Sequence, residues 1–530
     1  MSGFLVLGGH VWSWVPAVAN ANTVNSVGQS DFWYDASMGQ YFTPASLASG
    51  GTTTGWYSKN SGSYVPTTGF GPTYGGGSYS LPNLYFAGTN AQNPVVASFT
   101  ATIAVSTAKT FTGTVTQTVG NAATATLNVT SNTAATIGIG YLVTGGTLPT
   151  GTYIYANQSG TATSSASSWT ITVPQGTTIP TNASSVTYTV TPVIMTVSTT
   201  GTGIVNLGGI VYKSSGGPSA NTFVTATANE NSSLTGTGGT GTYLVNISQT
   251  LASTTALTQF LPFVGFNSGD AFRVPMTAGD RVVSGYTVCM SYKWGVATGH
   301  VSMLGSTHGN GGDFSWGNNA GVREYNVAGA TATGGSVSAT GWHVISLVYD
   351  GTQPDNASRF KVFVDGVQDT LTFTGTVGSS TTAPAAMTCT ASAAAISGSN
   401  MVLTYPTTGS PAWQVGDTIT VSGLVPAQTS GTVNNVNGTF TVTTCTNTTV
   451  GYAMSGTYTR TSGGTVTGTP IPNLMVAGKA PIASATKNTN PVTTTQGINI
   501  GEFIVYKTAL TPAARSSVET YLRNKWLGKA

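Results

Sequence analysis

The chain has 530 residues, of which 39% are hydrophobic and 6% are charged, and its formal net charge is +3. Disordered chains combine low hydrophobicity with high net charge, so this composition excludes a largely disordered protein, and the length predicts two to four domains. The 17 Lys and Arg residues are scattered, which excludes the basic surface that DNA or RNA binding requires.

Short runs of Thr, Val and Tyr between Gly and Asn indicate many short β-strands. The segment Met1–Trp12 has an apolar patch but no basic start, which predicts a strand and no signal peptide. No stretch approaches the roughly 20 apolar residues that cross a bilayer, so we expect no membrane insertion. Cys289, Cys389 and Cys445 lack metal-ligand spacing and predict buried free thiols in a protein that folds in a reducing cytosol.

The first strand-like segments in chain order are Asp31–Ser37, Gly55–Asn60 and Leu84–Asn90. A further strand-like segment lies at Phe266–Phe272. The family resemblance given below implies that the residues between, about 93–258, are an insertion.

This first insertion contains two strand-rich units. The unit at about 93–192 contains Ile137–Val143, and the unit at about 193–258 contains Gly203–Val211, both rich in Gly and β-branched residues. We expect each unit to be a small β module.

The most informative segment is the pair Gly341–Gly351 and Phe360–Val367. Apolar side chains occupy both faces of the first strand, which predicts a strand buried on both sides, and Asp-Gly turn signals follow each strand. The two strands therefore predict a β-hairpin.

A second insertion follows at about 381–470. Gln414–Gly423 and Asn437–Val442 alternate in the manner of strands and predict a small Ig-like β module. The interrupted pattern resumes at Ile498–Tyr506.

One convincing helix closes the chain, between Thr511 and Gly528. Thr511 suits the N-cap, Pro512 suits the first helical position and Gly528 suits the exit. One apolar stripe with i, i+3, i+4 and i+8 spacing predicts its buried face; the stripe consists of Val518, Tyr521, Leu522 and Trp526.

These segments resemble the concanavalin A-like lectin/laminin G-like jelly roll. The resemblance rests on the W-H strand at Trp342, the V-D-G strand at Val364, and the ending from Val505 to Trp526. It implies an all-β jelly-roll sandwich, assembled from residues 1–92, 259–380 and 471–530, with one C-terminal helix.

The two insertions are similar to β modules that recur in phage tail and head-surface proteins. Together with the jelly roll they imply a structural protein of a bacteriophage virion. Such a protein is made in the host cytoplasm and acts at the virion surface, which agrees with the absence of a signal peptide.

Catalytic constellations are not apparent in the sequence. Glycoside hydrolysis needs two carboxylates about 5–9 Å apart, and none of the four glutamates belongs to a strand of alternating carboxylates; they are Glu230, Glu324, Glu502 and Glu519. No G-x-S-x-G elbow occurs, and the four histidines have no triad or H-E-x-x-H spacing. We therefore expect no enzyme, with a secreted glycoside hydrolase as the weakest alternative.

The best window for a sugar site is His308–Asn319, which combines an aromatic ring with polar side chains. The candidate glycan-binding residues are His308, Asn310, Asp313, Trp316 and Asn318. A glycine-rich hairpin with Trp316 in the core is the competing interpretation and the one that sandwich structures favour.

A calcium site is conceivable, because Asp270, Asp313 and Asn318 offer hard oxygen donors. Calcium needs six or more ligands, however, and the sequence has no DxDxDG-type loop. We therefore predict no metal and no other cofactor.

The sequence favours a tail fibre or baseplate adhesin that contacts host-surface glycans. The alternative is a capsid or tail decoration protein, or a head-fibre protein. The expected partners are other virion proteins, further copies of the same chain and host-surface polysaccharide.

Overall fold

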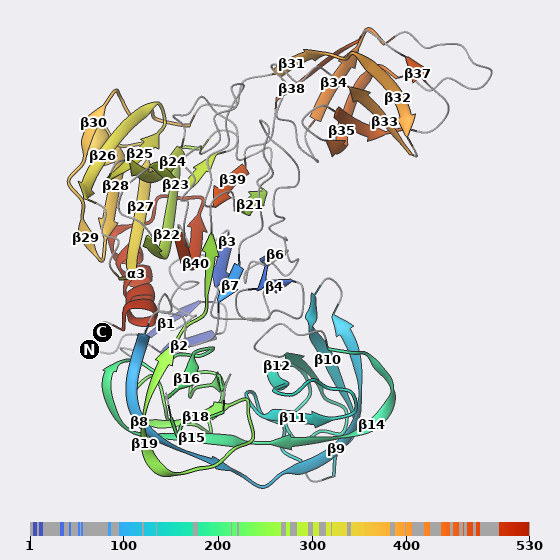
Figure 1. The fold of residues 1–530 in the computed structure, drawn as a ribbon, viewed down its shortest axis with the longest axis vertical. Coiled ribbons are helices and arrows are strands. Elements are labelled where there is room, and N and C mark those ends of the chain that lie inside the picture. The colour runs from blue at the N-terminus through green and yellow to red at the C-terminus, as the bar shows by residue number, and fades with distance from the viewer. Residues whose placement is uncertain are drawn as a thin grey trace.

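A computed structural model gives the fold of the chain (Figure 1). The structure describes residues 4–7, 10–13, 32–35, 42–43, 51–52, 55–56, 83–85, 95–118, 121–133, 135–172, 179–213, 215–219, 222–266, 272–275, 283–294, 300–306, 314–319, 321–336, 341–381, 387–397, 399–404, 418–424, 436–445, 449–454, 459–460, 464–469, 473–476 and 498–528.

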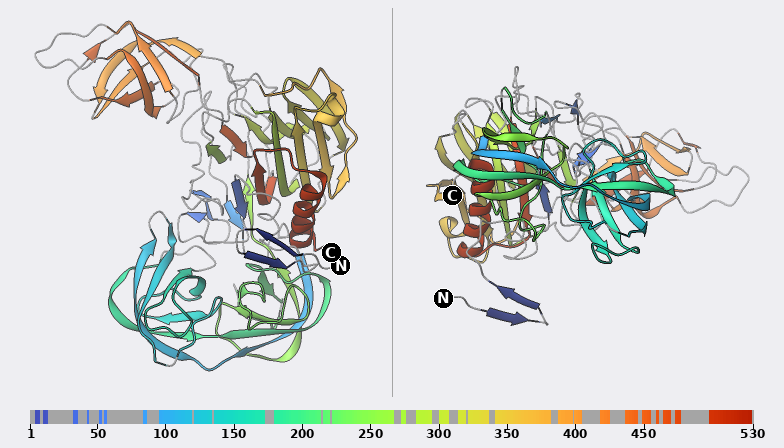
Figure 2. Two further views of the ribbon diagram at one scale, coloured as in Figure 1. Left: turned by 180° about the vertical axis from the view of Figure 1, so that it is seen from behind. Right: turned by 90° about the horizontal axis from the view of Figure 1, so that it is seen from below.

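The protein is all-β with one long C-terminal helix, as the sequence predicts. Three groups of sheets follow one another along the long axis of the molecule, with a two-sheet sandwich in the middle (Figures 1 and 2). The first insertion lies at one end, and the unit at 381–470 lies at the other.

Two antiparallel sheets form the sandwich around one shared core. The first sheet runs in the order β29-β28-β27-β22-β40-β20-β7-β5, and β3 also pairs with β40. Its strands are β3 Phe32–Asp35, β5 Gly51–Thr52, β7 Asn83–Tyr85, β20 Phe263–Phe266, β22 Gly285–Trp294, β27 His343–Asp350, β28 Phe360–Val364, β29 Val367–Gln368 and β40 Ile498–Tyr506.

The second sheet runs in the order β21-β39-β23-β24-β25-β26-β30. Its strands are β21 Phe272–Pro275, β23 His300–Ser306, β24 Phe314–Asn319, β25 Val322–Val327, β26 Ala330–Ser336, β30 Thr372–Thr374 and β39 Asn473–Val476. Met290 and Leu347 of the first sheet share the core with Tyr325 and Ala332 of the second. The jelly-roll connectivity itself remains a prediction.

The hairpin predicted from the W-H and V-D-G segments is confirmed. Strands β27 and β28 pair antiparallel, and all residues of β27 between its two ends are buried. A short helix, α2 (Asn356–Arg359), lies in the connection between them. The second Asp-Gly pair forms a tight turn, with φ of 52° at Asp365 and 85° at Gly366.

All three sequence blocks assigned to the sandwich supply strands to its first sheet. Strand β40 from the last block lies between β22 of the middle block and β3 of the first. The sheet therefore needs residues more than 400 positions apart in the sequence. The assignment of residues 1–92, 259–380 and 471–530 to one domain remains a prediction.

The first insertion contains a closed barrel in the order β10-β13-β12-β11-β14-β9. Its strands are β9 Lys109–Thr118, β10 Asn121–Ser131, β11 Leu142–Gly145, β12 Tyr153–Ser159, β13 Ser168–Thr172 and β14 Asn182–Thr191. The barrel has its own core, which includes Phe111, Leu127 and Trp169.

A six-stranded sheet in the order β16-β19-β8-β15-β18-β17 completes the first insertion. Its strands are β8 Val95–Val105, β15 Val193–Gly203, β16 Ile210–Tyr212, β17 Val224–Ala226, β18 Gly241–Val245 and β19 Leu251–Phe260. A β-bridge between Ile210 and Phe223 joins its two edges.

The boundary between the two insertion modules differs from the predicted one at residue 192. Strand β8 falls in the predicted first module, but it pairs with β15 and β19 of the six-stranded sheet. The barrel is therefore inserted into the β8–β15 hairpin. Local patterns in the sequence could not reveal this, because the two paired strands lie almost 90 residues apart.

The unit at 381–470 is an antiparallel sheet system in the order β31-β38-β34-β35-β36-β33-β32-β37. Its strands are β31 Met387–Thr390, β32 Ala393–Ser397, β33 Asn400–Thr404, β34 Thr418–Ser422, β35 Gly438–Cys445, β36 Thr449–Ala453, β37 Thr459–Arg460 and β38 Thr465–Thr469. It has a separate core. The remaining described strands form two small antiparallel pairs. Strand β1 (Phe4–Leu7) pairs with β2 (His10–Ser13), and β4 (Phe42–Thr43) pairs with β6 (Gly55–Trp56).

The terminal helix α3 spans Pro512–Leu527 and matches the predicted helix. The Thr511 side chain accepts a hydrogen bond from Ala514 N, and Gly528 is left-handed with φ of 60°. All four residues of the predicted apolar stripe are buried, and α3 packs against strands β22 and β27 of the first sheet.

The nested topology predicts that the barrel can be removed at the end of a hairpin. Val105 and Val193 are register partners, and Ser106 N donates to Pro192 O at 2.9 Å. Replacing residues 107–191 by Asn-Gly should close a two-residue hairpin and leave the sandwich folded. Circular dichroism and thermal unfolding should show a cooperative β protein. Aggregation, or loss of the cooperative transition, would contradict the nested arrangement.

Candidate functional site

The structure places only part of the predicted glycan site. His308, Asn310 and Asp313 lie outside the described residues, as does the calcium candidate Asp270. Trp316 is 1% exposed and belongs to the sandwich core, where the competing interpretation placed it. The glycan site itself remains a prediction.

Asn318 follows Trp316 on β24 and is also buried. Its side-chain oxygen accepts a hydrogen bond from Gly321 N at 2.8 Å, across the β24–β25 turn. This contact assigns Asn318 to the support of a turn.

Trp316 belongs to an aromatic cluster between the two sheets, formed by Tyr292, Trp294, Trp316 and Tyr325. The Tyr292 ring meets Trp316 edge to face at 5.1 Å, and Trp294 meets Trp316 edge to face at 6.0 Å. Tyr325 stacks on Trp316 at 6.5 Å. These edge-to-face and offset arrangements are the favoured geometries of ring pairs.

His343 and Asp365 form the first of two ion-pairing contacts beside this cluster. Asp365 Oδ2 lies 2.9 Å from His343 Nδ1, and Asp365 Oδ1 accepts from Val344 N at 2.9 Å. The left-handed turn at Asp365 and Gly366 aims the carboxylate back at β27. The W-H and V-D-G segments are thus joined by one carboxylate.

Arg323 and Asp369 form the second contact. Arg323 Nε donates to Asp369 Oδ2 at 3.0 Å, and Gly335 N donates to Asp369 Oδ1 at 3.2 Å. Asp369 follows β29 of the first sheet, whereas Arg323 and Gly335 belong to the second. The contact therefore ties the two sheets together.

We call the aromatic cluster together with Arg323, His343, Asp365 and Asp369 the polar end of the sandwich. Burial raises the pKa of Tyr292 and of Tyr325, while the nearby Arg323 charge acts in the opposite direction. Both phenols therefore stay protonated at neutral pH. Several charges gather here in a chain that contains few of them.

The polar end does not have the geometry of an acid–base catalyst. A His–Asp pair activates a nucleophile through the outer imidazole nitrogen. His343 Nε2 is buried, and no described hydroxyl or thiol forms a hydrogen bond with it. Within the described ranges, no group of three or more His, Cys, Asp or Glu side chains could hold a metal ion.

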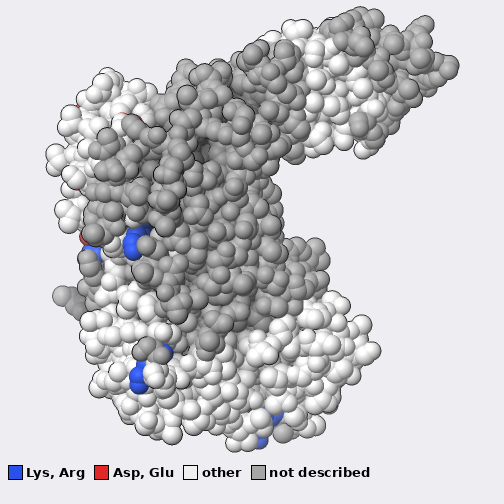
Figure 3. All heavy atoms as spheres, viewed as in Figure 1, with Lys and Arg blue, Asp and Glu red and all other residues white. Residues whose placement is uncertain are grey.

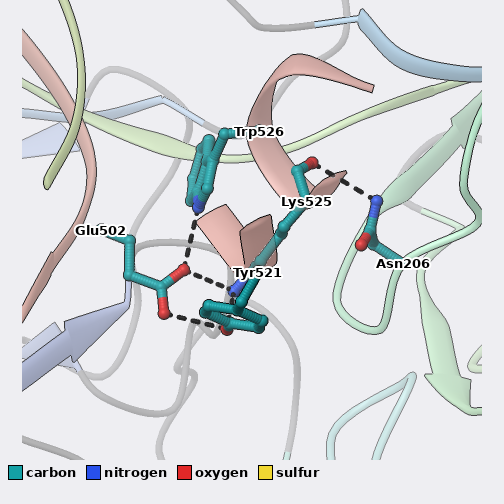
Figure 4. A network of polar contacts seen from close by, with 5 residues as sticks. All are labelled: Asn206, Glu502, Tyr521, Lys525 and Trp526. Carbon is teal, nitrogen blue, oxygen red and sulfur yellow. Dashed lines mark hydrogen bonds and ion pairs between the residues drawn. The ribbon is translucent and has the colours of Figure 1, made fainter. Parts of the chain in front are cut away.

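A second polar network, which we call the Glu502 junction, lies on the opposite face of the first sheet (Figure 4). The buried Glu502 carboxylate accepts from Tyr521 OH at 2.9 Å, Lys525 Nζ at 2.9 Å and Trp526 Nε1 at 2.8 Å. All three donors come from α3, whereas Glu502 comes from β40. Three donors satisfy a carboxylate that would otherwise be costly to bury.

The Glu502 junction reaches the first insertion as well. Asn206 Nδ2 donates to the backbone oxygen of Lys525 at 3.4 Å (Figure 4). Gln259 holds Asn206 through bonds of 2.7 and 2.8 Å to its backbone. Gly203 and Gly528 approach so closely that a Cβ on Gly203 would lie 3.1 Å from Gly528 Cα. The helix, the sandwich and the six-stranded sheet meet at this point.

The described contacts of the four glutamates are with hydrogen-bond donors. Glu502 belongs to the junction, and Glu519 accepts from Arg515 Nη1 at 2.5 Å on α3. Glu230 accepts from Thr227 N at 2.9 Å within a turn, and Glu324 accepts from Asn319 Nδ2 at 2.6 Å.

The thiol of Cys289 is free and buried, as predicted, and burial raises its pKa to about 12. The side chains of Cys389 and Cys445 lie outside the described residues. In the part of the chain that the structure describes, no helix has the length and apolarity to cross a membrane.

The sequence analysis missed the Glu502 junction and the ties made by Asp365 and Asp369. Tyr521, Lys525 and Trp526 have i, i+4 and i+5 spacing, which places them on neighbouring positions of one helix face. A lysine beside that apolar stripe was the available signal for a buried acidic partner. The identity of the partner depends on strand pairing and could not be read locally.

No family model matches the chain, and no curated protein matches it.

Trp316→Ala should destabilise the fold, because it removes a large ring that is fully buried between the sheets. Such truncations typically cost about 3–5 kcal/mol of unfolding free energy. Chemical denaturation should show this loss, while Val367→Ala, at a side chain 72% exposed, should change little. An unchanged stability for Trp316→Ala would place the ring outside the core.

Lys525→Met should be strongly destabilising, because it leaves the Glu502 carboxylate buried without its cation. Breaking a buried ion pair costs about 3–5 kcal/mol, and adding Glu502→Gln should recover part of the loss by removing the uncompensated charge. The matched control is Lys213→Met at an exposed lysine, which should stay within about 0.5 kcal/mol of the wild type. Equal effects of the two lysine variants in denaturant unfolding would refute the role of the junction.

Proposed function

We propose that this chain is a non-enzymatic surface protein of a bacteriophage virion. The observation that carries the proposal is the sparsely charged, hydroxyl-rich outer face of the first insertion, presented by a module that is joined to a sandwich core. On the face shown in Figure 3, the described surface carries few charged side chains.

Rows of Ser and Thr hydroxyls pair across the strands of this face. Ser98 bonds to Thr202 at 2.9 Å and Thr100 to Ser198 at 3.0 Å on the six-stranded sheet. On the barrel, Thr130 bonds to Thr112 at 3.2 Å and to Ser185 at 2.6 Å. Such a face can form many weak contacts with a partner through its neutral hydroxyl groups, which suits multivalent display on a particle.

The attachment of the insertion to the sandwich supports the same proposal. Val96, Ile210 and Phe223 of the insertion belong to the same hydrophobic core as Trp526 and Phe503 of the sandwich. A module packed in this way is presented in a fixed direction, as a structural component of a particle requires.

Two roles fit a virion surface protein. As a tail fibre or baseplate adhesin, the chain would contact host-surface glycans. As a capsid or tail decoration protein or a head-fibre protein, it would contact other virion proteins and further copies of itself. The burial of Trp316 favours the second role, because the predicted glycan window then lacks its stacking ring.

A secreted glycoside hydrolase is the weakest proposal. Each glutamate carboxylate is engaged by neighbouring donors, and none of those contacts involves a second carboxylate. We expect the purified chain to release no reducing sugar from host polysaccharide.

Immunogold labelling of intact virions with an antibody to this chain tests the proposal. We expect labels spread over the capsid or tail for the decoration role, and labels at the tail tip or baseplate for the adhesin role. Particles that lack the gene serve as the control. Virions without any label, from a host in which the protein is abundant, would overturn the proposal.

A further inference from the structure

The Glu502 junction holds an amine and a carboxyl group in contact and away from water. Lys525 Nζ lies 2.9 Å from Glu502 Oε2, and the two side chains point toward each other (Figure 4). Glu502 is 0% exposed and Lys525 is 7% exposed. Two reacting groups held together in this way have a very high effective concentration, and bulk water does not compete with the amine.

The Tyr521 hydroxyl connects the same two groups by a second path. It accepts from Lys525 Nζ at 3.3 Å and donates to Glu502 Oε1 at 2.9 Å. A phenol can accept one proton while it donates another. Protons can therefore pass from the amine to Oε1 through Tyr521.

The Trp526 indole holds the other carboxylate oxygen. Its Nε1 donates to Glu502 Oε2 at 2.8 Å. The ring lies directly on β40, where a Cβ on Gly501 would come within 2.4 Å of it, and Trp342 stacks on it with ring centroids 5.5 Å apart. A donor fixed in this way stabilises the negative charge that Oε2 gains when a nucleophile attacks the carboxyl carbon.

The charged pair is also more costly to bury than the amide that it can form. An ammonium and a carboxylate both lose their hydration in a dry site, whereas an amide is neutral. An amide that joins Lys525 to Glu502 has one carbonyl oxygen and one N–H. Trp526 can donate to that oxygen and Tyr521 can accept from that N–H, so the groups in place suit the amide.

We propose that Lys525 and Glu502 condense to an isopeptide bond once the chain has folded. Nζ attacks Cδ of Glu502, so that the Nζ–Cδ bond forms and the Cδ–Oε1 bond breaks. Nζ gives up two of the three ammonium protons, both pass to Oε1 through Tyr521, and Oε1 leaves as water. The condensation changes no oxidation state and needs no co-reactant.

The isopeptide bond ties the C-terminal end of α3 to β40 covalently. The backbone oxygen of Lys525 also accepts from Asn206, so the bond lies where the first insertion meets the sandwich. The inference concerns the covalent state of the chain and goes beyond the proposed function. It does not depend on where an antibody labels virions, so the two can fail separately.

Mass spectrometry of the purified chain, unfolded in denaturant, tests the proposal. We expect the mass of the sequence less one water molecule, because an ion pair is lost on unfolding and an isopeptide bond is kept. Trypsin should then release residues 488–507 and 524–529 as one branched peptide that is uncut after Lys525. The full sequence mass, with residues 488–507 recovered as a separate peptide, would overturn the proposal.

Lys525→Arg is the matched control. Arginine keeps the positive charge, but its guanidinium stays protonated and cannot act as the nucleophile. This variant should have its full sequence mass. A loss of water in this variant as well would place the dehydration elsewhere in the chain and overturn the proposal.

Tyr521→Phe tests the proton path, because it keeps the ring and removes the hydroxyl. At equal times after synthesis, a smaller fraction of these chains than of wild-type chains should have lost water. Equal fractions in the two proteins would contradict the role of Tyr521 in the condensation.

Discussion

The buried carboxylate of Glu502 is the interaction on which the arrangement of the molecule depends. It lies on β40, the strand that joins β22 to both β20 and β3, and it accepts hydrogen bonds from Tyr521, Lys525 and Trp526 of α3. A buried charge of this kind tolerates one geometry only, because each lost donor leaves part of the charge unsolvated. The helix is thereby fixed on the sheet, and its C-terminal end meets the six-stranded sheet at Asn206 and Gly203.

The way several sheets end reduces the number of strand edges that this sparsely charged β protein offers for pairing between copies. Closure removes the edges of the barrel, and a bridge joins the edges of the six-stranded sheet. On one side of the sandwich, the edge strands β29 and β30 have only two and three residues. Contacts through faces and loops are therefore more compatible with this fold than pairing of strand edges between copies, and the proposed assembly on a virion would use them.

Much of the fold could be predicted wherever one segment contains its own signals. Thr511, Pro512 and Gly528 mark the ends of α3 within the segment itself, and the alternation through β27 shows burial on both faces. The nesting of the barrel could not be predicted, because β8 carries no mark of its distant partner β15. The Glu502 junction could not be predicted for the same reason, because Lys525 indicates a buried acidic partner but does not identify it as Glu502. For the candidate site, the sequence located Trp316 in an informative window, yet the exposure of its ring depends on which side of β24 faces the first sheet.

Native-state hydrogen exchange followed by mass spectrometry is the most direct test of the claim that α3, the sandwich and the six-stranded sheet form one cooperative unit through the Glu502 junction. The account predicts that the amides of β8, β15, β40 and α3 share one slowest opening event, and that Lys525→Met accelerates exchange in all four elements together. Faster exchange confined to α3, with β8 and β15 still protected as in the wild type, would contradict it.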